Sequence, residues 1–284
     1  SSSALDIATD LGGLSAGVIS KAAMHTPTHV SEEAVQHAQE VNADCVVSVG
    51  GGSTTGLGKA IALRTGLPQI VIPTTYAGSE ATPSLGQTEG GVKTTLTDKR
   101  VLPDVVLYDP ELVVTLPVGM TITSALNAMA HAAEALYARD KDADSTNLAI
   151  SGLRSFAHAL PDVLHAPNDI AAREETLRGA WACGAVLGRV GMALHHKLCH
   201  TLGGTFDLPH AETHSIILPH AAAYNQTAAA DALAPVVNVL GGATPGQALY
   251  DFAQRMGAPT ALRDYGVSES DMDHAAELAL TKPY

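Results

Sequence analysis

The sequence predicts an α/β domain followed by an all-α domain. Over the first 116 residues, short β-branched runs alternate with helical stretches, which is the pattern of a parallel sheet with crossover helices. From Pro117 onward, Ala and Leu become dense and apolar residues recur every three or four positions, as they do in helices. We therefore expect residues 1–116 to form the α/β domain and residues 117–284 to form the helical domain.

The α/β domain is predicted to contain three buried parallel strands. Their apolar, β-branched runs lie at residues 44–49, 69–72 and 105–108. A helix is predicted from Ser53 to Arg64, between the first two strands. Ser31 is the expected N-cap of an earlier helix, because Glu32 and Glu33 follow it and acidic residues favour the first turn.

The helical domain is predicted from periodicity and from signals at the helix ends. Residues 121–136 form one strongly helical stretch, with Thr121 or Thr123 as its N-cap. The helix that carries His196 is expected to end at Gly203-Gly204, because glycine is common just after a helix. The segment 271–284 is predicted to form one more helix.

The composition favours a globular protein that binds small molecules. Hydrophobic residues make up 46% of the 284 residues, and 16 Lys and Arg against 29 Asp and Glu give a net charge of −13. This charge argues against binding to nucleic acid or to an anionic membrane, which needs clustered basic residues. No apolar run approaches the length of a membrane span. The three cysteines are widely spaced, so we expect no disulfide framework and a cytoplasmic location.

A glycine-rich loop follows the first predicted strand. Gly50, Gly51 and Gly52 precede Ser53 at the start of the next helix, where backbone N–H groups and the helix dipole favour a phosphate. The second strand leads into the hydroxyl-rich segment 73–80, and ligands bind at this carboxyl edge of a parallel sheet. The two loops together predict a dinucleotide site, although an ordinary strand-to-helix turn explains the three glycines equally well.

Three pairs of polar residues, each spaced four apart, indicate the chemistry of the helical domain. They are Asn127 and His131, His196 and His200, and His210 and His214. This spacing puts both members of a pair on one helical face. Clustered imidazoles serve as metal ligands, general acids or carboxylate binders, whereas a single histidine is more often a satisfied core residue. Asn127 is a neutral amide and a poor metal ligand.

These motifs resemble the iron-containing alcohol dehydrogenase superfamily over nearly the whole chain. The similar segments are 50–53, 73–75, 78–80, the helix with Asn127 and His131, 196–204 and 208–210. The longer segments 195–204 and 208–214, together with 51–59 and 92–95, are similar to the maleylacetate reductase branch. The resemblance implies a nucleotide-binding α/β domain, a helical catalytic domain and a homodimer.

The resemblance also implies where a metal would lie. The four ligand positions of the superfamily fall on Asn127, His131, His196 and His210. The family has Asp at the first position, so the charge that would offset a divalent cation is absent and we expect no bound metal. A further family histidine, near the nicotinamide, falls on His200. Family members usually carry another strand before Ser1 and more helix beyond Tyr284, so we expect the sequence to be incomplete at both ends.

The implied reaction is reduction of the carbon–carbon double bond of 2-maleylacetate, a dicarboxylate, to 3-oxoadipate in the degradation of aromatic compounds, with NADH or NADPH as hydride donor. We expect a metal-free catalytic pocket made by His131, His196, His200, His210, Asn127 and Lys197. We expect the cofactor to be bound by Gly51, Gly52, Ser53, Thr74, Thr75, Ser79 and Lys93, with Tyr76 on the nicotinamide side. Cys199 is expected to have a packing role.

Three other functions stay open from the sequence. A metal-dependent alcohol dehydrogenase on the same fold is disfavoured by Asn127 and by the doublet His195-His196. A catalytically decayed nucleotide-binding protein is disfavoured because all four pocket histidines are retained. A lyase on the related dehydroquinate synthase fold would need an intact metal site and a more basic phosphate pocket than a chain of net charge −13 suggests.

Overall fold

The computed structural model describes residues 2–281, apart from the side chains of Ser2, Ser3 and Lys93. The chain divides into two compact units, Ser1–Val113 and Val114–Tyr284. The first unit holds every strand of the described residues, and the second is built from helices. Among the described helices, none combines the length and the apolar character needed to cross a membrane.

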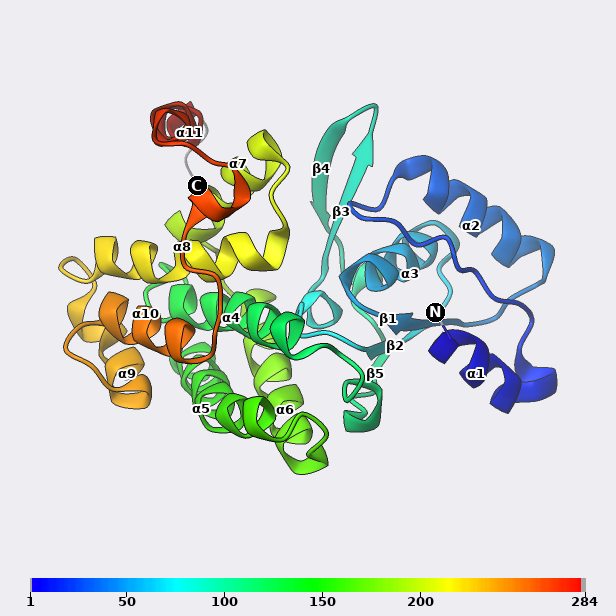
Figure 1. The fold of residues 1–284 in the computed structure, drawn as a ribbon. Helices are drawn as coiled ribbons and strands as arrows, with labels where there is room; N and C mark the ends of the chain where they lie inside the picture. The colour runs from blue at the N-terminus through cyan, green and yellow to red at the C-terminus, as the bar shows by residue number, and fades with distance from the viewer. Residues whose placement is uncertain (1, 282–284) are drawn as a thin grey trace. The chain divides into compact units, whose positions relative to one another are not determined.

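The first unit is organised around a three-stranded parallel sheet (Figure 1). Its strands are β1 (Val46–Gly50), β2 (Gln69–Pro73) and β5 (Val105–Val106), in the order β1-β2-β5. Helix α3 (Gly52–Thr65) connects β1 to β2, which is the crossover that parallel pairing requires. The strands predicted from β-branched runs are therefore present, with the third shortened to two residues.

Two α-helices precede this sheet, α1 (Ser2–Leu11) and α2 (Thr28–Glu40). The predicted cap of α2 at Ser31 is wrong. The helix starts three residues earlier, after Pro27, and the Ser31 hydroxyl lies inside the helix and donates to the Pro27 carbonyl at 3.2 Å. Proline fixes the backbone at a helix start, and this outweighs the capping tendency of a serine one turn later.

An antiparallel hairpin, which the sequence analysis does not predict, forms a second sheet. Strands β3 (Ser84–Glu89) and β4 (Val92–Thr97) pair through a two-residue turn at Gly90 and Gly91. Both glycines have positive φ, 55° and 80°, as the tight turns of hairpins require. The strands are rich in threonine and exposed on one side, so they lack the apolar run that marks the parallel strands.

A buried ammonium group ties α3 to the segment after β2. Lys59 is 1% exposed, and its Nζ donates to the carbonyl oxygens of Ser79, Thr82 at 2.7 Å and Ser84 at 2.9 Å, and to the Thr82 hydroxyl at 3.0 Å. Burial lowers the pKa of Lys59 to about 7, while the charge of buried Glu80 opposes that shift. The Lys59 contacts fix the short helix η2 (Ser79–Ala81) and the start of β3.

The substitution Lys59→Met should destabilise this unit strongly. It removes the donor and leaves buried acceptors without a partner, which we expect to lower the free energy of unfolding by about 2–4 kcal/mol. Urea unfolding of the two proteins measures the difference. Lys99→Met is the matched control, because Lys99 is exposed and should tolerate the change. Equal losses in both variants would show that the buried ammonium does not hold this segment.

The second unit packs helices around α4 (Figure 1). Its helices are α4 (Val118–Ala135), α5 (Ala143–His165), α6 (Ile170–Leu187), α7 (Leu194–Phe206), α8 (His210–Asn225), α9 (Ala230–Leu240), α10 (Pro245–Arg255) and α11 (Glu269–Thr281). Helix α4 contacts α5, α6 and α8 and is buried over most of its length. Its side chains therefore sit in fixed positions at the centre of the unit. Residues 282–284, at the end of the predicted final helix, lie outside the described residues.

The start of α4 is held by a fully buried arginine. Arg173 donates to the Thr121 hydroxyl at 2.8 Å, to the Leu116 carbonyl at 3.2 Å and to the Pro167 carbonyl at 2.9 Å. The predicted N-caps, Thr121 and Thr123, are wrong, because α4 begins at Val118 with Pro117 at the N-cap position. Thr121 accepts the hydrogen bond from Arg173.

Helix α7 does not end at Gly203-Gly204 as predicted. It continues to Phe206 and ends at Asp207, whose φ of 51° is left-handed. The helix is held beyond its glycines because Leu202 is buried with Cys199 and Ile217 in one apolar cluster, against which Phe206 packs. Tertiary packing overrides the local stop signal here.

Candidate active site

Helix α4 presents three polar side chains at intervals of four and three residues. Asn127, His131 and Glu134 are each at most 3% exposed, so all three are buried polar groups, and the other residues of α4 from Ala125 to Ala135 are apolar. The spacing puts them on one helical face. This face supplies the first part of the candidate site.

The Glu134 carboxylate accepts hydrogen bonds from the start of α7. Its Oε1 accepts from the His195 amide at 2.7 Å and its Oε2 from the Ala193 amide at 3.0 Å. Its Oε2 also lies 2.6 Å from His196 Nδ1, and the Tyr137 hydroxyl donates to Oε1 at 3.1 Å. A carboxylate at this place satisfies amides that a helix start leaves unpaired and meets the positive end of the helix dipole.

The hydrogen bonds keep Glu134 ionised despite its burial. Burial opposes the charge, but the hydrogen bond and charge of His196, together with the Ala193 amide, lower the pKa of Glu134 to about 2. The carboxylate in turn requires a proton on His196 Nδ1, because two lone pairs would repel each other at 2.6 Å. His196 Nε2 is consequently the nitrogen that faces away from Glu134.

Six imidazole rings from α4, α7 and α8 form a contiguous cluster. The ring centroids of His196 lie 5.1 Å from His131, 5.2 Å from His195 and 5.0 Å from His214. His214 lies 4.3 Å from His210, and the sixth ring, His200, lies 6.1 Å from His196. The cluster therefore joins side chains of α4, α7 and α8 in one place.

Burial favours the neutral form of three histidines of the cluster. Burial, assisted by the neighbouring imidazoles, lowers the pKa of His195 to about 3 and the pKa values of His131 and His214 well below their ordinary value. Of the seven buried side-chain atoms without a hydrogen-bond partner in the described structure, four lie at this site: Asn127 Oδ1, His131 Nδ1, His196 Nε2 and His214 Nε2. A buried polar atom without a hydrogen bond raises the free energy of the folded state. Such atoms therefore mark places where a ligand would be bound.

The six predicted catalytic residues lie on α4, α7 and α8, but not all are buried. Asn127, His131 and His196 are buried, His200 and His210 are exposed, and Lys197 is half-buried beside His196. The predicted site lacked three residues that the structure places there: the two cluster histidines His195 and His214, and Glu134 beside them. The signal for Glu134 was its place seven residues after Asn127, on the face that carries His131.

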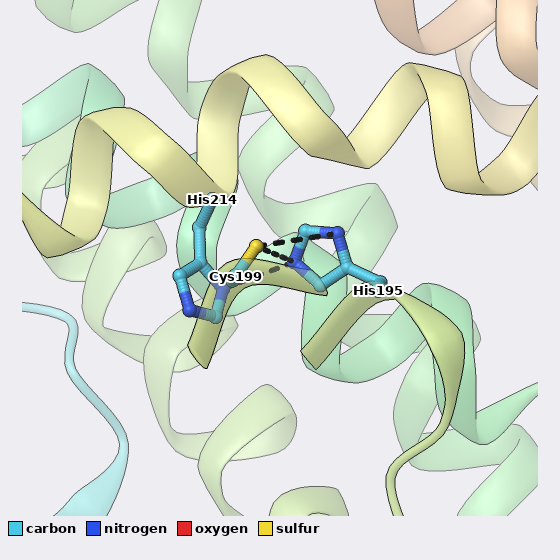
Figure 2. Close-up of side chains that lie close together, drawn as sticks. All are labelled: His195, Cys199 and His214. Atoms are coloured by element: carbon cyan, nitrogen blue, oxygen red, sulfur yellow. Dashed lines mark hydrogen bonds between the residues drawn. The ribbon is translucent and has the colours of Figure 1, made fainter. Parts of the chain in front are cut away.

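Cys199 lies inside the cluster, one turn after His195. Figure 2 shows the side chains of His195 and Cys199 from α7 and of His214 from α8 pointing toward one another. Cys199 Sγ is 3.6 Å from His195 Nε2, which is itself 3.0 Å from His214 Nδ1. Burial, and then the charge of Glu134, raises the pKa of the Cys199 thiol, so the free side chain is protonated. Its expected packing role is also present, against Leu202 and Ile217.

The predicted cofactor residues of the first unit meet at the ends of β1 and β2. Gly51 is the N-cap residue of α3, and Gly52 and Ser53 form its first turn. A Cβ on Gly51 would lie 3.0 Å from Thr75 Cγ2, so glycine lets the two loops approach closely. Thr74 donates its amide to the Gly50 carbonyl at 3.0 Å, and Ser79 Oγ is buried without a partner among the described residues.

Two further residues, Tyr76 and Lys93, were predicted to lie beside the cofactor. Tyr76 is fully buried, so its ring is a core side chain of this unit. The side chain of Lys93, in β4, lies outside the described residues.

Comparison with known proteins gives the family. The iron-containing alcohol dehydrogenase model matches residues 2–110, and the C-terminal model of the Fe-containing alcohol dehydrogenase family matches residues 121–283. The chain belongs to the iron-containing alcohol dehydrogenase family. It is 61% identical over 278 residues to a maleylacetate reductase of Rhizobium sp. strain MTP-10005, covering 98% of this chain and 79% of that protein.

A second relative and a solved structure agree with this placement. A maleylacetate reductase of Burkholderia cepacia is 51% identical over 278 residues, which is 98% of this chain and 79% of that protein. The crystal structure of the Rhizobium sp. strain MTP-10005 maleylacetate reductase superposes with a TM-score of 0.96 at 60% identity, covering 100% of this chain and 81% of that one. This similarity confirms the predicted combination of an α/β unit and a helical unit.

The family name implies iron, and the four expected ligand positions fit it poorly. Asn127 Oδ1 and His196 Nε2 are buried without a hydrogen-bond partner among the described residues, but an amide and three imidazoles supply no negative charge. The carboxylate of Glu134 is occupied by His196 and the amides of α7. A divalent cation here would lack a negative ligand. Membership of an iron-containing family nevertheless gives no support to the expectation that no metal is bound, so metal dependence is tested below.

The carboxylate of Glu134 should make the stability of this unit depend on pH. Its folded-state pKa is depressed, so its contribution is fully present above the ordinary value of 4.5 and is lost as the pH falls towards about 2. We expect the wild type to be more stable than Glu134→Gln by about 3 kcal/mol at neutral pH, the equivalent of that pKa difference. The difference in free energy of unfolding between the two proteins should decrease below pH 4.5. Chemical unfolding at several pH values measures it.

The control for this series is Glu174→Gln, which removes an exposed carboxylate from the surface of α6. It should change the stability little at any pH. A pH-independent difference between the wild type and Glu134→Gln would contradict an ionised, hydrogen-bonded carboxylate.

Proposed function

We propose that this protein reduces the carbon–carbon double bond of 2-maleylacetate to give 3-oxoadipate, with NADH or NADPH as the hydride donor. The observation that carries the proposal is the six-imidazole cluster with Asn127 in place of a carboxylate ligand, in a chain 61% identical to a maleylacetate reductase. The substrate is a dicarboxylate and an enone. Imidazole donors suit both its carboxylates and the oxyanion that develops during reduction.

The reaction places two demands on the protein. Hydride adds to the alkene carbon β to the ketone, so negative charge builds on the ketone oxygen as an enolate. The enolate must be stabilised and the adjacent carbon protonated. The 2.6 Å contact of Glu134 with His196 Nδ1 orients the ring so that Nε2 faces away from the carboxylate, and in the protonated ring Nε2–H is the group suited to donate to the enolate. Neutral His131 and the amide of Asn127 lie on the facing helix and complete the polar lining.

The remaining predicted residues have supporting roles. The exposed imidazoles of His200 and His210 are placed at the edge of the cluster, where they could bind the substrate carboxylates, and Lys197 adds positive charge on the same helix. In the first unit, the start of α3 at Gly51, Gly52 and Ser53 would bind the cofactor diphosphate. The hydroxyls of Thr74, Thr75 and Ser79, with Lys93, complete that set.

The proposed oligomeric state and cellular location rest on the family alone. We infer a homodimer that works in the cytoplasm in the degradation of aromatic compounds. The alternatives, a metal-dependent alcohol dehydrogenase and a decayed nucleotide-binding protein, gain no support from the structure or from the relatives. A decayed site would have no need to keep His196 buried and oriented by a carboxylate, as it is here.

The decisive experiment follows NADH oxidation with 2-maleylacetate, in the presence and absence of EDTA. We expect turnover that survives the chelator, because no step described above needs a metal. His196→Gln should lower kcat by at least about 100-fold, since it removes the proton donor and keeps the size of the side chain.

The control is His158→Gln, which changes an exposed histidine of α5 and should leave kcat unchanged. Loss of turnover with EDTA would return a metal to the mechanism. Normal turnover by His196→Gln would contradict the role of this residue. NADH binding without turnover of maleylacetate in the wild type would contradict the proposed reaction.

A further inference from the structure

We propose that His195, Cys199 and His214 form a binding site for a thiophilic divalent cation of the Zn²⁺ type, separate from the four positions where the family would place iron. None of these three residues belongs to the family set of Asn127, His131, His196 and His210. The proposal goes beyond the reduction of maleylacetate and does not depend on it.

The three side chains are brought together by helix geometry. His195 and Cys199 are four residues apart on α7 and therefore share a face, and His214 comes from α8, which packs against α7. All three are buried, at 0%, 3% and 1% exposure. Their ligand atoms lie within 4.8 Å of one another (Figure 2).

The spacing is close to what a tetrahedral ion needs. Zinc–nitrogen bonds of about 2.0–2.1 Å and zinc–sulfur bonds of about 2.3 Å place two nitrogens about 3.4 Å apart, and nitrogen and sulfur about 3.6 Å apart. His195 Nε2 is 3.0 Å from His214 Nδ1 and 3.6 Å from Cys199 Sγ. Cys199 Sγ lies within 4.8 Å of the His214 ligand nitrogen, so the side chain of Cys199 would have to move toward His214 when an ion binds. The fourth position would be left to water.

The three proposed ligands have the charge and the chemical softness that Zn²⁺ prefers. Two imidazoles and one thiolate are typical zinc ligands, and the thiolate supplies the negative charge that the family positions lack in this chain. The Glu134 carboxylate accepts the backbone amide of His195 at 2.7 Å, so the α7 turn that carries two of the ligands is already fixed before an ion binds. A preformed site binds with a smaller ordering cost.

Binding of the ion displaces protons from the Cys199 thiol and from the hydrogen bond between the two histidines. Coordination breaks the S–H bond of Cys199, and this proton leaves to the solvent. The proton shared between His195 Nε2 and His214 Nδ1 moves to the outer nitrogen of whichever ring carries it, either His195 Nδ1 or His214 Nε2, so the two imidazoles stay neutral. His214 Nε2 is buried and has no partner within the described residues, so it is free to hold that proton. One proton is therefore released for each ion bound.

Cobalt(II) tests the site directly, because it replaces zinc and reports its ligands by absorption. Metal-stripped full-length protein is titrated with Co²⁺ under anaerobic conditions. We expect one ion per chain, tetrahedral d–d bands, a thiolate-to-cobalt charge-transfer band in the near ultraviolet and release of one proton per ion. Cys199→Ser should abolish the charge-transfer band and weaken binding at least about 10-fold. His214→Gln, which keeps the thiol, should weaken binding by a similar factor.

Two controls separate this site from the others in the chain. Cys45→Ser changes a half-buried cysteine of the first unit and should leave the spectrum unchanged. His131→Gln removes a ligand of the family set and should also leave it unchanged. A charge-transfer band that persists in Cys199→Ser, bound cobalt that is lost in His131→Gln, or no stoichiometric binding by the wild type would each overturn the proposal. Turnover of maleylacetate is a separate readout, so a failure here does not affect the proposed function.

Discussion

The buried carboxylate of Glu134 holds the helical unit in the arrangement that its histidines need. It comes from the central helix α4, and it accepts hydrogen bonds from the amides that open α7, from the Tyr137 hydroxyl and from the His196 ring. A buried charge costs several kcal/mol unless it is fully partnered, so the carboxylate and the start of α7 constrain each other. The position and the tautomer of His196 follow from that constraint, and the positions of His195 and Cys199 follow from the course of α7.

The α/β unit uses a buried ion of the opposite sign for a comparable purpose. The ammonium of Lys59 is bound by backbone oxygens of the segment after β2, including that of Ser79. This segment carries hydroxyls proposed to meet the cofactor. In each unit, therefore, a buried charged side chain on a helix fixes a polar segment whose position the local secondary structure does not determine. The apolar core supplies stability around these charges, but it does not by itself determine where the polar atoms point.

The sequence patterns predicted the features that depend on local periodicity. Apolar β-branched runs located the parallel strands, and the spacing of four residues placed Asn127 with His131 on one face. The patterns failed where a tertiary contact decided the outcome. Glu134 was missed because an acidic residue within a helix is usually a surface residue, and only the fold brings the start of α7 to it. The caps at Ser31 and Thr121 were wrong because a proline already started each helix, and Thr121 is instead a partner of Arg173. The glycine pair of α7 failed as a stop because Leu202 and Phe206 pack into the core.

Imidazole nitrogen NMR of protein labelled at histidine tests most directly whether Glu134 places the proton of His196. At neutral pH, we expect His196 to carry a proton on Nδ1 in the wild type and to lose this preference in Glu134→Gln. A wild-type His196 with a bare Nδ1 and a proton only on Nε2 would contradict the account, since a lone pair cannot face a carboxylate oxygen at 2.6 Å.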